Sequence, residues 1–295
     1  MKSRQEQKSL LGLILSMCIF GTIGIVRRYI DMPSSFIALC RAVIGTVFLA
    51  LIVIIRRDRI DFAAIRRNLL WLALSSVFLG FNWILLFEAY NYTTVTTATL
   101  CYYMAPTLVV LASHFLFRER LNRRKALCVL VALGGMVLVS GVLKTGIPSL
   151  QELKGVLFGL GAAVFYACVV LLNKKISLSS PFDRTIIQLG LAGIILLPYT
   201  LLTEDVAAIQ WSSSGILLLI VAGIVHTGIP YALYFSSVRA LPAQTAALFS
   251  YIDPILAIIL SALVLKEPIG IAEILGAVLI LGAAYISEKT SYEGD

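Results

Sequence analysis

Two charged side chains interrupt runs of otherwise apolar residues, and these groups could carry chemistry. Asp253 stands immediately before Pro254 in YIDPILAIILSALVLKE, residues 251–267. A carboxylate in such surroundings can take up a proton, pair with a cation or bind a charged solute. A structural role explains the pattern equally well, because Asp is favoured at the N-cap of a helix and Pro at the next position.

Arg41 is the second such charge, and it lies inside the apolar run 34–55. At ~1.5 Å per residue it is ~10 Å from the start of that run, which is a long way for its guanidinium to reach water. Counted from the helix ends, Arg41 and Asp253 have comparable depth. This predicts either an ion pair between them or a substrate carboxylate held by Arg41. A purely structural ion pair is the alternative.

His226 lies in the middle of VAGIVHTGIPYALYF, residues 221–235, and Pro230 follows four residues later. A histidine can carry a proton near neutral pH. The proline should loosen the helix at this point, because it lacks an amide hydrogen. The alternative for His226 is a hydrogen-bonded side chain of the core.

Further polar side chains stand deep within apolar runs, too far from the helix ends for an interfacial belt. Each combines an apolar body with a polar group, which suits a cavity for a small ligand, and ordinary packing is the alternative. These candidates for substrate binding are Asn82, Trp83, Tyr102, Tyr103, Tyr166, Tyr231 and Tyr234. The positions expected to break or loosen helices are Pro106, Pro230 and Pro254.

Metal and cofactor chemistry is not predicted. All five cysteines fall inside apolar runs, no CxxC pair occurs, and the two histidines, His114 and His226, are far apart in the sequence. The cysteines are therefore interpreted as small apolar side chains of helices, and no cofactor is expected.

The elements that must position these groups are membrane-spanning helices. The chain is 59% hydrophobic and only 14% charged, with a mean hydropathy of +0.94. A soluble domain averages roughly 45–50% apolar and about 25% charged residues. The apolar runs are continuous and do not alternate as barrel strands do, so a polytopic all-α membrane protein is predicted.

Ten apolar segments are predicted to span the bilayer, each close to the ~20 residues that a spanning helix needs. They cover residues 9–27, 34–55, 69–90, 93–117, 124–142, 153–173, 184–202, 214–236, 243–265 and 270–287. The net charge of +8 reflects basic clusters between these segments, and no basic patch interleaved with aromatic residues indicates nucleic-acid binding. Most Lys and Arg residues fall on the side of the N-terminus, which predicts both termini in the cytoplasm.

The two halves of the chain repeat each other at a constant offset of 148 residues. Aligning residues 97–134 on 245–282 without a gap matches Tyr103 with Tyr251, Pro106 with Pro254 and Glu119 with Glu267. Since each half contains five predicted helices, the second half enters the membrane from the opposite side. Residues 1–145 and 146–295 are therefore predicted as two inverted repeats, an architecture suited to alternating access around a midplane site.

The duplicated blocks resemble EamA-type members of the drug/metabolite transporter superfamily. The resemblance rests on AYNYTTVTTATLCYYMAPTLVVLASHFLFRERL (89–121) with GGMVL (134–138), and on ALPAQTAALFSYIDPILAIILSALVLKEPI (240–269) with LGAVLILGAAYI (275–286). It implies five-plus-five helices, a central cavity, and export or exchange of small metabolites, often amino acids. Phe20 replaces a tryptophan that such proteins often carry before a glycine, and Asp253 replaces their usual glutamate.

We therefore expect a multi-pass transporter of the cell (inner) membrane, and not an enzyme, that moves a small polar or amphipathic metabolite. Proton coupling through Asp253 or His226 and a homodimer are left open. A carrier of nucleotide-sugars or lipid-linked substrates would need more cations in its cavity than Arg41 supplies. An intramembrane enzyme would need a convergent catalytic motif, and the spacing of the polar residues supplies none. Glu119 and Glu267 are expected to brace helix ends.

Overall fold

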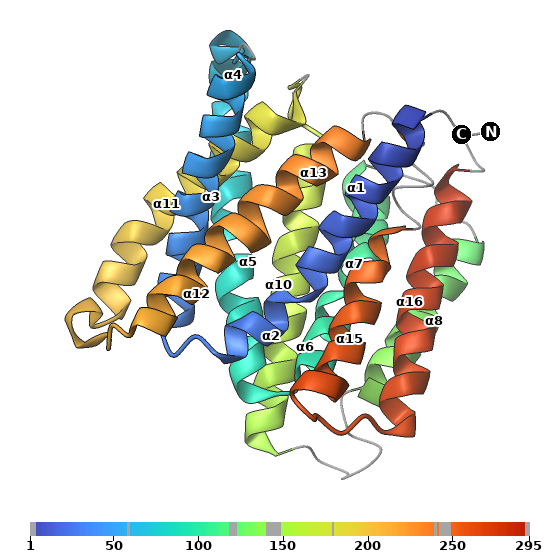
Figure 1. Ribbon diagram of the computed structural model, residues 1–295. Coiled ribbons are helices and arrows are strands. Elements are labelled where there is room, and N and C mark those ends of the chain that lie inside the picture. Colours follow the sequence, from blue (N-terminus) through green and yellow to red (C-terminus); the bar gives the residue numbers. More distant parts are fainter. Residues whose placement is uncertain are drawn as a thin grey trace.

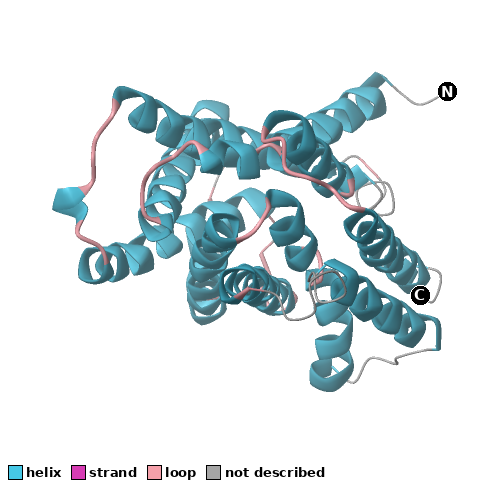
Figure 2. Ribbon diagram, turned by 90° about the horizontal axis from the view of Figure 1, so that it is seen from below, coloured by secondary structure: helices cyan, strands magenta, loops and turns pink. Residues whose placement is uncertain are grey.

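The structure is a computed structural model that describes residues 4–57, 60–117, 123–139, 149–178, 180–238, 241 and 249–292. In this part of the chain all regular elements are helices, joined by loops and turns, and there are no strands (Figures 1 and 2). The helices of the N-terminal half are α1 (Arg4–Gly21), α2 (Ile23–Arg28), α3 (Ser34–Arg56), α4 (Phe62–Arg67), α5 (Leu69–Tyr92), α6 (Val95–Tyr102), α7 (Ala105–Phe117) and α8 (Arg123–Val139). Those of the C-terminal half are α10 (Leu150–Asn173), α11 (Pro181–Thr203), the 3-10 helix η1 (Val206–Ala208), α12 (Ser213–Gly223), the π-helix η2 (Ile224–Gly228), α13 (Ile229–Val238), α15 (Ile252–Val264) and α16 (Ile271–Tyr292).

Seven helical stretches of the described chain are long and apolar enough to cross a bilayer. They are Gln5–Arg28, Ser34–Arg56, Leu69–Tyr92, Val95–Leu116, Leu150–Asn173, Pro181–Thr203 and Ser213–Ser237, and the shorter apolar helices Ile252–Val264 and Ile271–Ser287 accompany them. Large apolar side chains such as Leu202, Ile55 and Phe115 point outward from the bundle. Such a surface suits a lipid environment and would be costly in water.

Three of the predicted spans are interrupted helices. The span predicted at 9–27 begins earlier, at Arg4, and breaks at Thr22, whose hydroxyl donates to the Ile19 carbonyl at 2.7 Å. The span at 93–117 breaks between α6 and α7, at Tyr103 and Met104. The span at 214–236 contains the π-helix η2. The chain therefore departs from regular α-helix next to several of the polar groups noted above.

Two short elements in the connections were not predicted. Asp61 caps the N-terminus of α4, where its Oδ1 accepts from the Ala64 amide at 2.9 Å, and Asp205 does the same for η1. The predicted boundary between residues 145 and 146 and part of the segment 243–265 lie outside the described residues.

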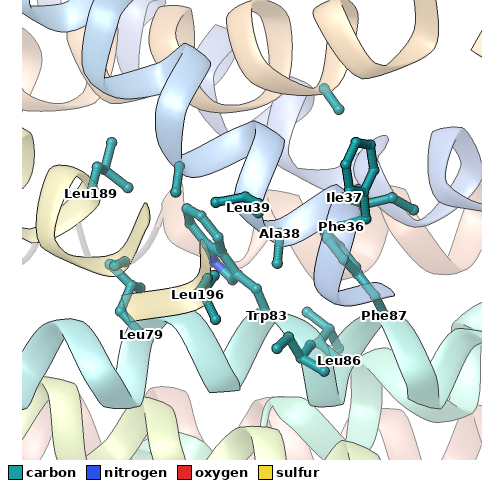
Figure 3. Packing of buried hydrophobic residues seen from close by; sticks show 14 of the residues in the cluster. Phe36, Ile37, Ala38, Leu39, Leu79, Trp83, Leu86, Phe87, Leu189 and Leu196 are labelled. Atoms are coloured by element: carbon teal, nitrogen blue, oxygen red, sulfur yellow. The ribbon is translucent and has the colours of Figure 1, made fainter. Parts of the chain in front are cut away.

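The largest hydrophobic core lies between α3, α5 and α11. Trp83 and Phe87 point from α5 toward α3, and Leu189 and Leu196 of α11 close the same space (Figure 3). This packing holds the middle of α3, where Arg41 lies, against the middle of α5.

The two halves of the chain pack against each other in a reciprocal pattern. Helix α10 packs on α5 and α6, while α1 packs on α13 and α15. Helix α3 pairs with α11, and α8 pairs with α16 at one side of the bundle (Figure 1). Gly155 and Gly159 let α10 approach Thr93 and Cys101 closely, so this glycine pair serves contacts within the chain.

Candidate functional site

Arg41 of α3 is held by a set of contacts within the protein. Its Nε donates to Thr227 Oγ1 at 3.0 Å and its Nη2 donates to the carbonyl oxygen of His226 at 3.3 Å. Its Cζ lies 4.3 Å from the ring centroid of Trp83 and 5.2 Å from that of Phe87, within cation–π range. Since only 5% of Arg41 is exposed, these contacts occupy most of its surface.

Pro230 explains why a backbone carbonyl in η2 is free to accept a hydrogen bond from Arg41 of α3. In a regular α-helix the amide of residue 230 would donate to the carbonyl of His226, and proline has no amide hydrogen. That carbonyl instead accepts from Arg41. Thr227 donates its hydroxyl to the Ala222 carbonyl at 3.0 Å, five residues back, which matches the wider turn of the π-helix.

Two glycines allow α3 and η2 to approach this closely. A Cβ placed on Gly45, one turn after Arg41, would lie 2.6 Å from a methyl carbon of Thr227. A Cβ on Gly228 would collide with the ring of Phe48 in α3. The short motif HTGIP in η2 and α13 therefore supplies the hydrogen-bond acceptors of Arg41, and its glycine allows α3 to pack closely.

His226 connects this irregularity to the break between α1 and α2. Its Nε2 lies 2.9 Å from Thr22 Oγ1, and its Nδ1 lies 3.3 Å from the Val221 carbonyl oxygen. The side chain is 3% exposed. Nδ1 must carry a hydrogen to bond a carbonyl, so a neutral ring accepts at Nε2 and Thr22 must turn its hydroxyl away from Ile19 to donate there. A protonated ring donates at both nitrogens.

A second group of side chains surrounds Asp253. Its Oδ2 accepts a hydrogen bond from the Tyr103 hydroxyl at 2.8 Å. The ring of Tyr102 lies 6.0 Å from that of Tyr103 and 5.5 Å from that of Tyr166, measured between centroids. The break between α6 and α7 falls at Tyr103, and Asp253 stands in the first turn of α15, so two helix irregularities bring these groups together.

The predicted pairing of Arg41 with Asp253 is not formed. The structure gives Arg41 the partners in η2 and gives Asp253 the hydroxyl of Tyr103. The proposed N-cap role of Asp253 is also absent, because α15 begins one residue earlier, at Ile252, and the N-cap position is Tyr251. Equal depth along two helices thus did not bring the two charges into contact.

Of the other candidates, Trp83 stacks on Arg41, whereas Asn82 points to a different neighbour. Asn82 Nδ2 donates to the Ala162 carbonyl at 2.6 Å, so it braces α5 against α10. Tyr231 and Tyr234 form an aromatic row with Phe235 and Phe20, with centroid distances between 5.3 and 5.9 Å.

The aromatic row and the Asp253 group are neighbours. Tyr166 is within electrostatic range of Tyr231, Tyr234 and Asp253, and Tyr231 is within range of Arg41. Tyr166 is 38% exposed, and Tyr102, Tyr103, Tyr231, Tyr234 and Asp253 are each partly exposed. The protein therefore does not fully enclose this group of side chains, which we call the tyrosine cluster: Asp253 with Tyr102, Tyr103, Tyr166, Tyr231 and Tyr234.

Several residues of this region were not identified from the sequence. Thr22 and Thr227 are ordinary threonines in apolar runs, and Tyr90 lies within electrostatic range of Asp253 and Arg41 without any pattern that marks it. One signal was available: Thr227 precedes Pro230 by three residues, so it belongs to the turn that the proline disturbs.

A polar network ties several loops together at the lower end of Figure 1. Glu267 accepts from Arg28 at 2.9 Å and from the Val95 amide, the first residue of α6, at 2.8 Å. Ser261 also donates to Glu267 and accepts from Thr96. The expected bracing role is confirmed for Glu267, while Glu119 lies outside the described residues.

A cleft of about 320 Å³ lies elsewhere, between α15 and α16. Its lining is apolar except for Glu273, whose carboxylate accepts from the Gly270 amide at 3.0 Å. Within the described chain no group of His, Cys, Asp and Glu could hold a metal ion. The cleft offers little to recognise a polar solute, so the tyrosine cluster remains the candidate site.

Comparison with known proteins decides the family. The model of the EamA-like transporter family matches the chain twice, over residues 7–141 and 153–288. The chain belongs to the EamA-like transporter family. It is thus a multi-pass membrane protein with a two-repeat architecture, of a family of transporters and not of enzymes.

Relatives of this EamA-like chain include proteins that are named as transporters. The chain is 32% identical to the uncharacterized transporter YxxF of Bacillus subtilis (strain 168) over 94% of its own length and 88% of the relative's. It is 24% identical to protein RarD of Escherichia coli (strain K12), over 95% and 97% of the two chains. A crystal structure with 18% identity superimposes with a TM-score of 0.65 over 98% of this chain and 99% of the other, which supports the fold.

Proposed function

We propose that this EamA-like protein is a secondary transporter that moves a small metabolite across the cell membrane by alternating access. The metabolite is an amino acid or a related amphipathic solute, and the direction is export. The observation that carries the proposal is the tyrosine cluster. It brings a carboxylate and tyrosines from both halves of the chain to places where helices are interrupted. Binding sites at broken helices between repeats are characteristic of such transporters.

The proposed architecture is ten spans in two inverted halves, residues 1–145 and 146–295. The reciprocal packing supports it, since α10 meets α5 and α6 much as α1 meets α13 and α15. Inversion exchanges the two halves, so contacts between them should come in such matched pairs.

The proposed orientation places both termini in the cytoplasm. Helix α1 begins and α16 ends at the upper end of the bundle in Figure 1. The helix ends at that side carry most of the described basic residues, namely Arg4, Lys8, Arg56, Arg57, Arg66, Arg67, Arg123, Arg124, Lys125, Lys174, Lys175 and Arg184. Lys and Arg concentrate on the cytoplasmic side of membrane proteins.

A carrier of nucleotide-sugars is disfavoured by the contacts of Arg41. A diphosphate needs cationic donors that are free to form several charge-assisted hydrogen bonds. Arg41 is within electrostatic range of Tyr231 and is already bonded to η2 and stacked on Trp83, which leaves Arg184, within range of Tyr234, as the other arginine recorded near the cluster in the described chain.

Counterflow in proteoliposomes tests the proposed function. Vesicles with the purified full chain are loaded with unlabelled solute and given labelled amino acids, amines or sugar phosphates, with and without a pH gradient. We expect one class to accumulate above protein-free vesicles. Absence of exchange for every class, with protein that is shown to be folded by its circular dichroism, would contradict the proposal.

A further inference from the structure

We infer that the tyrosine cluster binds the ammonium group of an organic amine, with Asp253 as its counter-ion. The inference rests on the proposed function and specifies the chemical class of the solute.

Asp253 has no cationic partner among the described residues. Its Oδ2 accepts from the hydroxyl of Tyr103, and no donor of the described chain approaches its second oxygen, Oδ1. Arg28 and Glu267 form an ion pair elsewhere in the described chain. A carboxylate deep in a membrane protein is costly unless it is paired, protonated or hydrated. The vacant oxygen therefore favours a ligand that brings a positive charge and a hydrogen-bond donor.

Arg41 is not available to bind the negatively charged group of a solute. Its guanidinium donates to Thr227 and to the His226 carbonyl, lies on the face of Trp83, and belongs to a side chain that is only 5% exposed. Freeing it would leave the carbonyl of His226 without its donor, because Pro230 supplies none. The accessible charge beside Tyr103 is thus that of Asp253, whereas the cation recorded near Tyr234 is Arg184 of α11.

The rings around Asp253 suit a cation with an apolar body. The faces of tyrosine rings attract ammonium groups, and cages of aromatic rings are a recurring way to bind them. The rings of Tyr102 and Tyr166 are tilted against each other with 5.5 Å between centroids, and Tyr166 is the most exposed member of the cluster. The Tyr231–Phe235 stack, with 5.9 Å between centroids, extends the apolar surface beside them. A monoamine with an aromatic or short alkyl body matches these surfaces.

A matched ligand series tests the inference by binding, independently of transport. Calorimetric titration of the detergent-purified full chain uses phenethylamine, its neutral N-acetyl derivative, phenylacetate and phenylalanine. These four share one ring and differ in charge. We expect phenethylamine to bind, phenylalanine to bind more weakly because its carboxylate faces Asp253, and the neutral and anionic compounds to bind at least ~10-fold more weakly. Equal or tighter binding of phenylacetate or of the neutral compound would overturn the inference, as would no binding of phenethylamine.

Variants assign the ammonium contact to Asp253. Asp253→Asn should weaken phenethylamine binding by ~10-fold to ~100-fold, and Asp253→Glu should retain part of it. Asp31→Asn is the matched control, because Asp31 is an exposed carboxylate between α2 and α3. Unchanged affinity in folded Asp253→Asn would contradict the assignment. If that variant does not fold, the ligand series on the natural chain still decides.

Counterflow with the same compounds separates the inference from the proposed function. Amine binding without counterflow would support the ammonium site and contradict transport of this class. Counterflow of phenylacetate or of a sugar phosphate, without amine binding, would support transport and overturn the inference.

Discussion

At the scale of single residues, the two charged side chains Arg41 and Asp253 have different roles. Arg41 is buried and held by Thr227, the His226 carbonyl and Trp83, so it acts as a structural link between α3, α5 and η2. Asp253 has one carboxylate oxygen without a partner among the described residues, and its side chain is partly exposed. We therefore assign a structural role to Arg41 and contact with the ligand to Asp253.

The role of Arg41 can be measured through its acceptor. Thr227→Val removes the hydroxyl that accepts from Arg41 Nε, and we expect it to lower the free energy of unfolding by about 1–2 kcal/mol. Thr46→Val is the matched control, because the Thr46 hydroxyl donates only to the carbonyl of Ala42 in its own helix. The control should cost less than about 0.5 kcal/mol. Thermal unfolding followed by circular dichroism measures both, and equal destabilisation of the two variants would contradict the role.

Proton coupling should depend on Asp253 and not on His226. Only a deprotonated Asp253 carries the charge that attracts an ammonium group, so protons and amine compete, and amine affinity should fall as pH falls. His226 is 3% exposed and already bonded on both ring nitrogens. We expect His226→Gln to keep the effect of a pH gradient on counterflow.

The paired experiment uses Asp253→Asn, which should lose both amine counterflow and the response to the gradient. Loss of the gradient effect in His226→Gln, with exchange of the amine at equal pH retained, would instead make the histidine the proton carrier.

At the scale of helices, irregular segments and glycines bring the polar groups together. Gly228 lies at the end of η2, where its missing side chain leaves room for the ring of Phe48. Gly228→Ala should lower the free energy of unfolding by about 1–3 kcal/mol through overpacking. Gly282→Ala is the control, because a Cβ there meets no atom within 4 Å, and it should be neutral or stabilise the helix by up to about 1 kcal/mol.

The cause of the Gly228 effect can be isolated. Adding Phe48→Leu to Gly228→Ala should recover part of the lost stability if the ring is the obstacle, as read from thermal unfolding. A double variant that is no more stable than Gly228→Ala would show that the cost arises in the backbone of η2.

The same scale shows what could be predicted from the sequence. Long apolar runs were sufficient to locate α3, α5, α10 and α11, because their length and composition have few alternatives. Helix α4 was missed because six residues containing two arginines look like any basic connection.

The contacts of the site were harder to predict, for a physical reason. Counting residues along a helix gives the depth of a side chain but not its direction around the axis. A break such as the one at Tyr103 changes that direction again. Arg41 and Asp253 therefore had matching depths and different partners. The carbonyl that Pro230 frees was the more informative clue, because it predicts a nearby donor from local chemistry alone.

At the scale of the whole molecule, the network of Glu267 closes one end of the bundle. It joins α2, the start of α6 and the connection that follows α15. Its ion pair with Arg28 is partly exposed, with 30% of the arginine side chain accessible, and such pairs contribute only about 0–1 kcal/mol. The hydrogen bond from the Val95 amide satisfies a donor at the N-terminus of α6 and should contribute more to stability than the ion pair.

Three variants separate the contribution of the ion pair from that of the hydrogen bonds. Arg28→Ala should lower the free energy of unfolding by less than about 1 kcal/mol, whereas Glu267→Ala should cost about 1–3 kcal/mol because Val95 and Ser261 lose their common acceptor. Glu267→Gln, which can still accept from the Val95 amide, should fall between them. Thermal unfolding in one detergent compares all three. A larger loss in Arg28→Ala than in Glu267→Ala would show that the ion pair dominates.

The contact between Arg41 and Trp83 also gives the protein an optical probe. The sequence contains three tryptophans, and Trp83 is the one against which Arg41 lies, 4.3 Å from its ring. Replacing Trp71 and Trp211 by phenylalanine would leave a single indole whose emission wavelength follows the nearby positive charge. If solute binding shifts η2 and draws Arg41 with it, the colour of that emission changes, so the transport cycle could be followed in real time without an attached dye.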